Sequence, residues 1–254
     1  MQDESGPAGG LRAGLDEVRQ GPVPAHVAVI MDGNGRWARR RGLARWEGHR
    51  AGMEAVREAI GGAGEAGISH LTLYAFSQEN WDRPADEVEA LMALLEEYVD
   101  SQRDELAEAG IRVSVFGDRA RLSETARAAI DDLERATEAG GALWVHLAIS
   151  YGSRAEIVEA SRRLAAQCVA GDLAPDSIDE DRFARHLSTG GWPDPDLLVR
   201  TSGELRISNF LLWQLAYAEW YVTPVLWPDF RRADLFGAII DFRRRDRRFG
   251  LVTP

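Results

Sequence analysis

Lysine is absent from the 254-residue chain, so all of its 30 basic residues are arginines. A Walker-type phosphate loop and a Schiff-base mechanism both require a lysine, and both are therefore excluded. Acidic residues outnumber the arginines, and the formal net charge is -11. General nucleic-acid binding needs a basic field, so we expect no nucleic-acid partner.

Cysteine and long apolar runs are equally scarce. Cys168 is the only cysteine, which excludes a disulfide framework and a cysteine metal site. No apolar run approaches the ~20 residues of a membrane span. The acidic start of the chain lacks the apolar core of a signal peptide. We therefore expect a soluble, cytoplasmic protein.

The apolar residues, 45% of the chain, recur in a pattern of strands that alternate with helices. We predict strands over 26–30, 68–76, 111–116, 143–150, 196–200 and 219–223, and helices over 51–66, 88–106, 122–139, 157–169, 181–187, 210–217 and from 232 onward. This alternation predicts an α/β fold, a single domain over 23–254 with a six-stranded, mostly parallel sheet flanked by helices. Residues 1–22 predict a flexible N-terminal tail with one short helix at 11–19.

The segment from Met31 to Trp37 follows the first predicted strand, at the end where ligands bind in open α/β sheets. Gly33 and Gly35 let the backbone approach a ligand and turn N–H groups toward an anion, and Arg36 adds a charged fork. Asp32 is the type of residue that holds a divalent cation against a diphosphate. The segment is therefore a candidate phosphate site.

Two other interpretations of this segment remain open. All four residues of Asp-Gly-Asn-Gly favour a plain turn. Residues 33–38 also fit the loose dinucleotide fingerprint, with Glu54 about 20 residues further on. However, the next predicted strand begins only near Ile68, and arginines 39–41 occupy the place of an apolar packing helix.

A second group of polar residues follows the fifth predicted strand. Arg200, Arg206 and Ser208 are spaced so that two guanidinium groups and a hydroxyl could surround a phosphate. The alternative is a surface ion pair with Glu204. Glu219 could be a second metal carboxylate, or it could pair with an arginine.

Together these segments resemble the cis-prenyltransferases, over residues 24 to 250. The resemblance is carried by an ordered series of motifs: Met31–Ala38, Gly48–His49, Thr72–Ser77, Glu79–Trp81, Arg83–Pro84, Arg200–Glu204, Arg206–Phe210 and Tyr217–Glu219. It implies a homodimeric, Mg2+-dependent enzyme that adds isopentenyl diphosphate to an allylic diphosphate, farnesyl or geranyl diphosphate, and makes each new double bond cis. It also implies an apolar tunnel between the sheet and the long helices.

The resemblance assigns roles position by position. Asp32 and Asn80 would be catalytic, Asn80 as a proposed proton acceptor, and Asp32 and Glu219 would bind the metal. Substrate would be held by Gly33, Asn34, Gly35, Arg36, Trp37, Arg45, His49, Ser77, Gln78, Glu79, Trp81, Arg83, Arg200, Arg206, Ile207 and Ser208, and by Arg248 and Gly250 in the C-terminal R-x-G element that reaches a partner's active site. A neutral amide is a poor base, so the departing diphosphate or Asp32 is chemically more credible as the proton acceptor.

The expected product is a long-chain polyprenyl diphosphate such as undecaprenyl diphosphate, a lipid carrier for cell-wall sugars. Peripheral contact with the inner face of the membrane, through that product, is a further option. A short-chain cis-prenyl diphosphate synthase and a noncatalytic partner subunit remain alternatives. Small Ala75 and bulky Leu143 are candidate tunnel positions. Ser150 and Ser153 depart from the Asn-Tyr-Gly-Gly-Arg of many relatives.

Overall fold

Six strands, all parallel, form the centre of the molecule in the order β3-β4-β2-β1-β5-β6. The computed structural model describes residues 7–245, with side chains from Leu11. The strands are β1 (His26–Ile30), β2 (His70–Ser77), β3 (Ile111–Phe116), β4 (Leu143–Tyr151), β5 (Leu197–Arg200) and β6 (Glu219–Val222). The predicted α/β sheet is therefore confirmed, and its carboxyl edge collects the loops after β1, β2 and β5.

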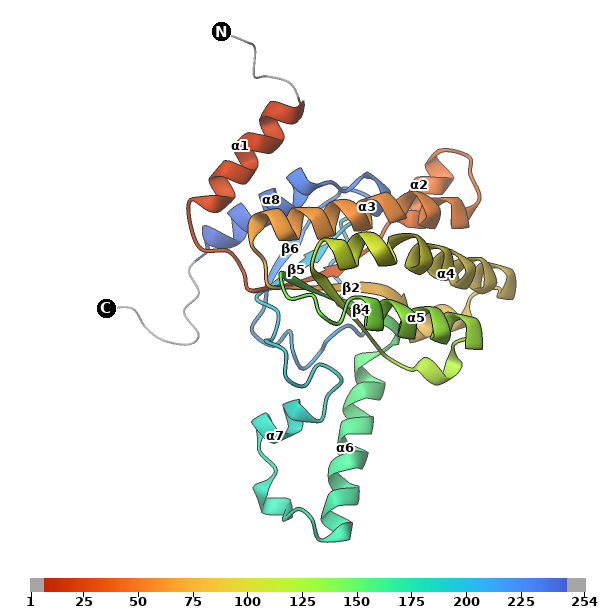
Figure 1. Ribbon diagram of the computed structural model, residues 1–254, viewed down its shortest axis with the longest axis vertical. Coiled ribbons are helices and arrows are strands. Elements are labelled where there is room, and N and C mark those ends of the chain that lie inside the picture. Colours follow the sequence, from red (N-terminus) through yellow and green to blue (C-terminus); the bar gives the residue numbers. More distant parts are fainter. Residues whose placement is uncertain (1–6, 246–254) are drawn as a thin grey trace.

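Helices cover the two faces of the sheet unequally (Figure 1). One face carries α1 (Pro7–Arg19), α3 (Arg45–Ala66), α4 (Ala85–Glu108), α5 (Glu124–Ala136) and α8 (Arg232–Arg243). From the other side extend α6 (Ser153–Ala170) and α7 (Glu180–Arg185), and α2 (Asn34–Arg40) follows β1. Short 3-10 turns lie at Gln78–Asp82, Arg119–Arg121, Pro175–Ser177 and Trp227–Asp229.

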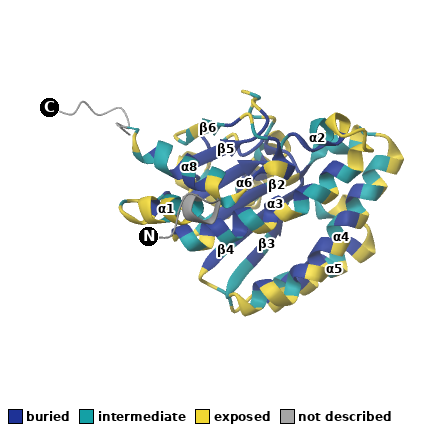
Figure 2. Cartoon of the chain, turned by 90° about the horizontal axis from the view of Figure 1, so that it is seen from above, coloured by how far each residue is buried: buried dark blue, intermediate teal, exposed yellow. Residues whose placement is uncertain are grey.

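The core lies on both sides of β1, all five residues of which are buried, as are the four residues of its neighbour β5, drawn in dark blue (Figure 2). Val27 and Val29 point into the larger cluster beneath α3 and α8, whereas Ala28 and Ile30 join a smaller cluster with Phe210. Because side chains alternate across a strand, burial on both faces requires a continuous apolar run, as the sequence shows. The segment that follows this strand thus continues from a fully buried strand that is paired on both sides.

The predicted helix over 210–217 is wrong. The structure has turns there, and Ser208, Asn209 and Leu211 adopt left-handed φ values of 54°, 56° and 43°. Left-handed residues cannot continue a right-handed helix, so the aromatic spacing was misleading. Conversely, α2 follows Gly33, where no helix is predicted from the sequence, and α3 begins at Arg45 instead of residue 51.

The segment expected as an N-terminal tail contains a 13-residue helix, α1. Leu11, Leu15 and Val18 pack against the larger core, and Val18 is fully buried. From Leu11 to Val18, this helix therefore packs against the larger core. Within residues 7–245, no helix is both long and apolar enough to cross a membrane.

Candidate functional site

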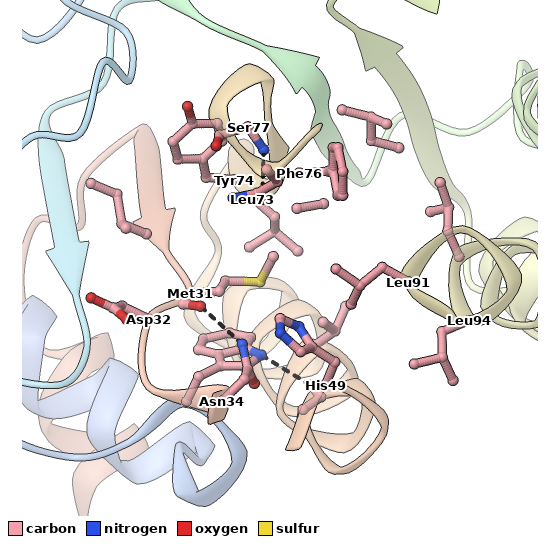
Figure 3. Close-up of a pocket in the computed structure, with 18 of the residues that line it drawn as sticks. Met31, Asp32, Asn34, His49, Leu73, Tyr74, Phe76, Ser77, Leu91 and Leu94 are labelled. Carbon is pink, nitrogen blue, oxygen red and sulfur yellow. Dashed lines mark hydrogen bonds between the residues drawn. The ribbon is translucent and has the colours of Figure 1, made fainter. Parts of the chain in front are cut away.

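A cavity of about 570 Å³ opens at the carboxyl edge of the sheet, between the strands and helices α3 and α4 (Figure 3). Polar groups line one part of it, among them Asp32, His49 and Arg200. Apolar side chains such as Leu91 and Leu94 of α4 line another part, on the side away from Asp32. The cavity thus joins a charged region to an apolar one.

Asp32 lies directly after β1 and is held by two arginines. Its Oδ2 is 3.0 Å from Nη2 of Arg200 and 3.3 Å from Nη2 of Arg36. Burial would raise the pKa of Asp32, but the hydrogen bond from Arg200 and the charges of both arginines outweigh it and lower that pKa below its ordinary value. Asp32 is therefore an ionised carboxylate at neutral pH.

Arg200 is the most deeply buried cation of this group, with 5% of its surface exposed. Its Nη1 donates to Ser208 Oγ at 2.9 Å, while its buried Nε has no hydrogen-bond partner among the described residues. A buried donor without a partner is costly. The arrangement suits an additional anionic ligand that brings its own acceptor oxygens.

Glu204 links two arginines at the rim of the cavity. Its two carboxylate oxygens lie 3.2 Å from Nη1 of Arg36 and 2.9 Å from Nη1 of Arg206. Arg36 also donates to the Ser202 carbonyl oxygen at 3.0 Å and to the Ser202 hydroxyl. An ion pair between Glu204 and Arg206 is therefore present, and Glu204 also holds Arg36, which contacts Asp32.

A second group of cations lies where α3 and α4 begin. Glu87 accepts from Arg83 at 2.9 Å and from Arg45 at 3.1 Å, which ties the start of α3 to the start of α4. Burial, followed by repulsion from Arg83 and Arg45, lowers the pKa of His49 to about 4, so the imidazole is neutral at neutral pH. His49 can therefore hydrogen-bond a ligand without adding charge.

A glycine allows the approach of α3 to the phosphate segment. A Cβ at Gly48 would lie 2.0 Å from the Asn34 carbonyl oxygen, so only glycine fits here. Gly33, at φ 112°, provides the sharp turn into α2. Buried Asn34 donates to the Met31 carbonyl at 3.2 Å, and its Oδ1 has no partner among the described residues.

The Ser77–Asp82 turn is held by its own side chains. Asn80 Oδ1 accepts from the Ser77 N–H at 3.1 Å, within a capping box. Trp81 packs edge-on against Phe76 at 5.0 Å between ring centroids and donates to Ser150 Oγ at 2.9 Å. The Asn80 amide oxygen is therefore engaged by the backbone, which gives it a structural role.

The structure brings most of the predicted site residues to this cavity, but not all. Those that line it are Asp32, Gly33, Asn34, Gly35, Arg45, His49, Ser77, Glu79, Asn80, Arg83, Arg200 and Ser208. Arg36 is not among the lining residues but contacts Asp32 directly, and Arg206 is connected to it only through Glu204. Trp37, Gln78, Trp81 and Ile207 are not among the lining residues. Arg248 and Gly250 lie outside the described residues.

Glu219 is not brought to Asp32 within one chain. It is the first residue of edge strand β6 and pairs in register with Leu197, whereas Asp32 follows the carboxyl end of β1. Its Oε2 instead lies 2.9 Å from Nη1 of Arg245. Across residues 7–245, we find no group of three His, Cys, Asp or Glu side chains placed to hold a metal.

Two residues of the site were missed. Glu87, which bridges Arg45 and Arg83, stands four residues after Arg83, and that helical ion-pair spacing could have revealed it. Asn209 donates to Glu79 at 2.8 Å and accepts from the Arg154 N–H, and so connects the loops after β2, β4 and β5. No sequence signal predicts those distant partners.

Only one of the two candidate tunnel positions faces the cavity. Ala75 lines it, at a bulge in β2 between Tyr74 and Phe76. Leu143 is 1% exposed within the larger core and is not a lining residue, so that expectation was wrong. Leu143 opens β4, near the opposite edge of the sheet, which places it away from the site.

Comparison with known proteins places this site in context. Residues 30–250 match the family model described as putative undecaprenyl diphosphate synthase. The isoprenyl transferase of Brucella abortus is 51% identical, with 91% of each chain covered, and that of Clostridium perfringens is 47% identical, with 90% covered.

Two solved structures are similar in fold. Lavandulyl diphosphate synthase from Lavandula x intermedia, in complex with dimethylallyl diphosphate, has a TM-score of 0.88 and 43% identity, covering 90% of this chain and 98% of that one. A probable undecaprenyl diphosphate synthase from Campylobacter jejuni has a TM-score of 0.75 and 33% identity, covering 91% and 99%.

Proposed function

The chain belongs to the undecaprenyl diphosphate synthase and isoprenyl transferase family of prenyltransferases, and we propose that it condenses isopentenyl diphosphate onto an allylic diphosphate in a Mg2+-dependent reaction. The primer would be farnesyl or geranyl diphosphate. The product would be a cis-elongated long-chain polyprenyl diphosphate, such as undecaprenyl diphosphate for a cell-wall lipid carrier.

The observation that carries this proposal is the single cavity with a charged and an apolar part. A prenyl diphosphate has the same two parts, an anionic head and a hydrocarbon chain. Asp32, His49 and Arg200 surround the place for the head, while Leu91 and Leu94 provide the surface for the chain. The apolar part would act as the tunnel that holds the growing product.

The residues present fit a magnesium ion. Mg2+ prefers oxygen ligands and keeps several waters, and it is usually bound through one or two carboxylates plus substrate phosphates. Asp32, ionised and 31% exposed in its side chain, can supply such a ligand. When bound, the ion would neutralise charge that develops on the departing diphosphate.

We assign the arginines of the site to two groups, one for the diphosphate of each substrate. We assign the allylic head to the loop N–H groups of Gly33–Gly35 with Arg36, Arg45 and His49, because these follow β1 and open α3. We assign the isopentenyl head to Arg200, Arg206 and Ser208. Both heads then meet at Asp32, where guanidinium groups stabilise the charge that forms as the allylic C–O bond breaks.

Removal of a proton from the isopentenyl unit needs a base. The Asn80 amide is neutral and its oxygen is committed to the Ser77 N–H, so we assign it to holding the loop. The departing diphosphate or Asp32 is the more basic group at the site.

Glu219 and the C-terminal R-x-G element would act in a homodimer. Since Glu219 lies apart from Asp32 in one chain, it can complete a metal site only if a second copy brings it there. A short-chain synthase is the second candidate, because the 43% identical relative is named for lavandulyl diphosphate.

Incubation of the purified chain with labelled isopentenyl diphosphate and farnesyl diphosphate tests the proposal directly. We expect extended products with Mg2+ and none after chelation, and their chain length separates the long-chain from the short-chain candidate. Absence of any extended product with either primer would contradict the enzyme assignment and favour a noncatalytic partner subunit.

A further inference from the structure

Residues 39–46, which we call the α2–α3 corner, form a part of the described surface where several arginines and two large apolar side chains lie together. All eight residues are exposed, and they include four arginines and no carboxylate. Leu43 is 45% exposed and Trp46 is 37% exposed. The two large apolar side chains lie three residues apart in this arginine-rich segment, so they form one local group with the cations.

The cations of this corner are arranged around tryptophan rings. The Arg41 guanidinium lies 4.0 Å from the Trp37 ring centroid, and that of Arg50 lies 5.6 Å from the Trp46 ring. Arg41 and Arg45 have acidic partners, Asp229 and Glu87. Arg39 and Arg40, by contrast, form no ion pair within residues 7–245, so their charge is available to an external anion.

The charge of this corner is opposite to that of the whole chain, which carries -11. An anionic surface would repel most of the molecule and attract this corner, and would therefore orient it. Arginine with tryptophan and leucine is the combination found where proteins meet lipid headgroups, since the rings sit at the boundary and the cations meet phosphate. The corner projects at the end of the molecule where α2 turns into α3 (Figure 1).

We propose that the α2–α3 corner docks the protein on the headgroups of an anionic phospholipid bilayer. The corner includes Arg45, which also lines the cavity, so docking would bring the charged mouth of the cavity to the lipid surface. This orientation rests on the proposed function, because a long prenyl product would need an apolar destination. The docking itself is measured without any prenyl substrate.

Vesicle sedimentation with the full chain tests this proposal. We expect the protein to sediment with vesicles of phosphatidylglycerol and phosphatidylcholine, to be released by high salt, and to stay in solution with phosphatidylcholine alone. The double variant Arg39→Glu/Arg40→Glu should bind at least about tenfold more weakly, since each basic residue contributes to attraction at an anionic surface. A matched variant, Arg12→Glu/Arg135→Glu, changes the net charge equally at exposed sites elsewhere and should bind like the unaltered chain.

A second variant separates apolar insertion from charge. Leu43→Ser/Trp46→Ser keeps every arginine and should also bind several-fold more weakly, with an unchanged melting temperature. Failure of the unaltered chain to bind anionic vesicles, or equal binding by all variants, would overturn the proposal. Unchanged vesicle binding with an altered oligomeric state in the Arg39/Arg40 variant would assign the corner to a contact between copies and would also overturn it.

Activity in vesicle-free solution distinguishes this proposal from the proposed function. The Arg39→Glu/Arg40→Glu variant should retain prenyl transfer there, because neither arginine lines the cavity. A chain that binds vesicles without any prenyl transfer would refute the proposed function and leave the docking surface standing.

Discussion

Two clusters of ionisable residues lie at opposite ends of the same sheet and differ in their charge state when buried. At the carboxyl edge, Asp32 stays ionised beside Arg200 and Arg36. Near the amino edge, burial lowers the pKa of His26 to about 4, despite the nearby Asp196 carboxylate, and lowers that of His146 to about 2. The Asp32 cluster is therefore charged at neutral pH, whereas the histidine cluster is neutral.

Hydrogen bonds complete the histidine cluster. His146 contacts Ser114 Oγ at 2.7 Å and His70 at 3.0 Å, and Trp192 stacks on its ring at 3.7 Å between centroids. His26 contacts Thr72 Oγ1 at 2.7 Å. Neutral groups satisfied in this way support packing, whereas an ionised Asp32 on a cavity wall is available for ligand chemistry. Substitutions at the carboxyl edge are therefore expected to change turnover, and substitutions in the histidine cluster to change the free energy of unfolding.

Asp32→Ala gives the largest expected effect. Loss of the carboxylate should lower turnover of isopentenyl diphosphate by orders of magnitude, because it removes the ligand assigned to the metal. The melting temperature should fall, because Arg200, 5% exposed, loses its carboxylate partner and keeps only the neutral Ser208, so turnover is compared at a temperature where both chains are folded. Turnover is measured with labelled substrate and saturating Mg2+. Near-normal turnover would exclude the assigned role.

Ala75→Leu should shorten the product. The added side chain would enter the cavity from the bulge in β2 and reduce the space for the prenyl chain. Chromatography of the extracted products measures the change. Leu143→Ala is the matched variant, since Leu143 lies in the core away from the cavity. It should keep the product length and lower the free energy of unfolding by about 2–5 kcal/mol. Identical product lengths in the Ala75 variant and the unaltered chain would contradict this prediction.

Acid should destabilise the fold through the histidine cluster. Unfolded histidine has a pKa of about 6.5, whereas folded His26 titrates at about 4. Between these values the unfolded state binds more protons, so the free energy of unfolding falls as pH decreases, by about 1 kcal/mol per pH unit for each such histidine. Denaturant unfolding at pH 7, 6 and 5 measures the slope. His146→Asn should reduce it, and an unchanged slope would show that the cluster does not control acid stability.

Ser114→Ala gives the smallest expected effect. It removes one partly buried hydrogen bond to His146 and should lower the free energy of unfolding by about 1 kcal/mol, with turnover unchanged. Ser101→Ala is the control, because Ser101 is an exposed residue of α4 and bonds only locally. Its unfolding midpoint should match that of the unaltered chain. A loss of turnover in Ser114→Ala would contradict the expectation that the histidine cluster affects only stability.

The position of a site residue could be predicted from the sequence where that residue closely follows a recognisable strand. The buried run before Asp32 located its loop, and Arg200 was placed at the same edge because parallel strands end together. The turns over 210–217 could not be predicted, because the aromatic residues there are spaced as in a helix. In addition, none of the residues with left-handed φ values in this region is a glycine, which would have signalled a turn. The role of Leu143 was also misjudged, because a residue buried in the core and one that lines a cavity have the same apolar character.

The sequence by itself determined the alternation of strands and helices and the chemical groups of the site, since both follow from local periodicity and residue type. Only the tertiary structure decided that Arg200 and Arg36 converge on Asp32, that α4 provides the apolar wall, and that Glu219 stands apart from them. These are contacts between segments far apart in the chain, and their geometry depends on how the whole core packs.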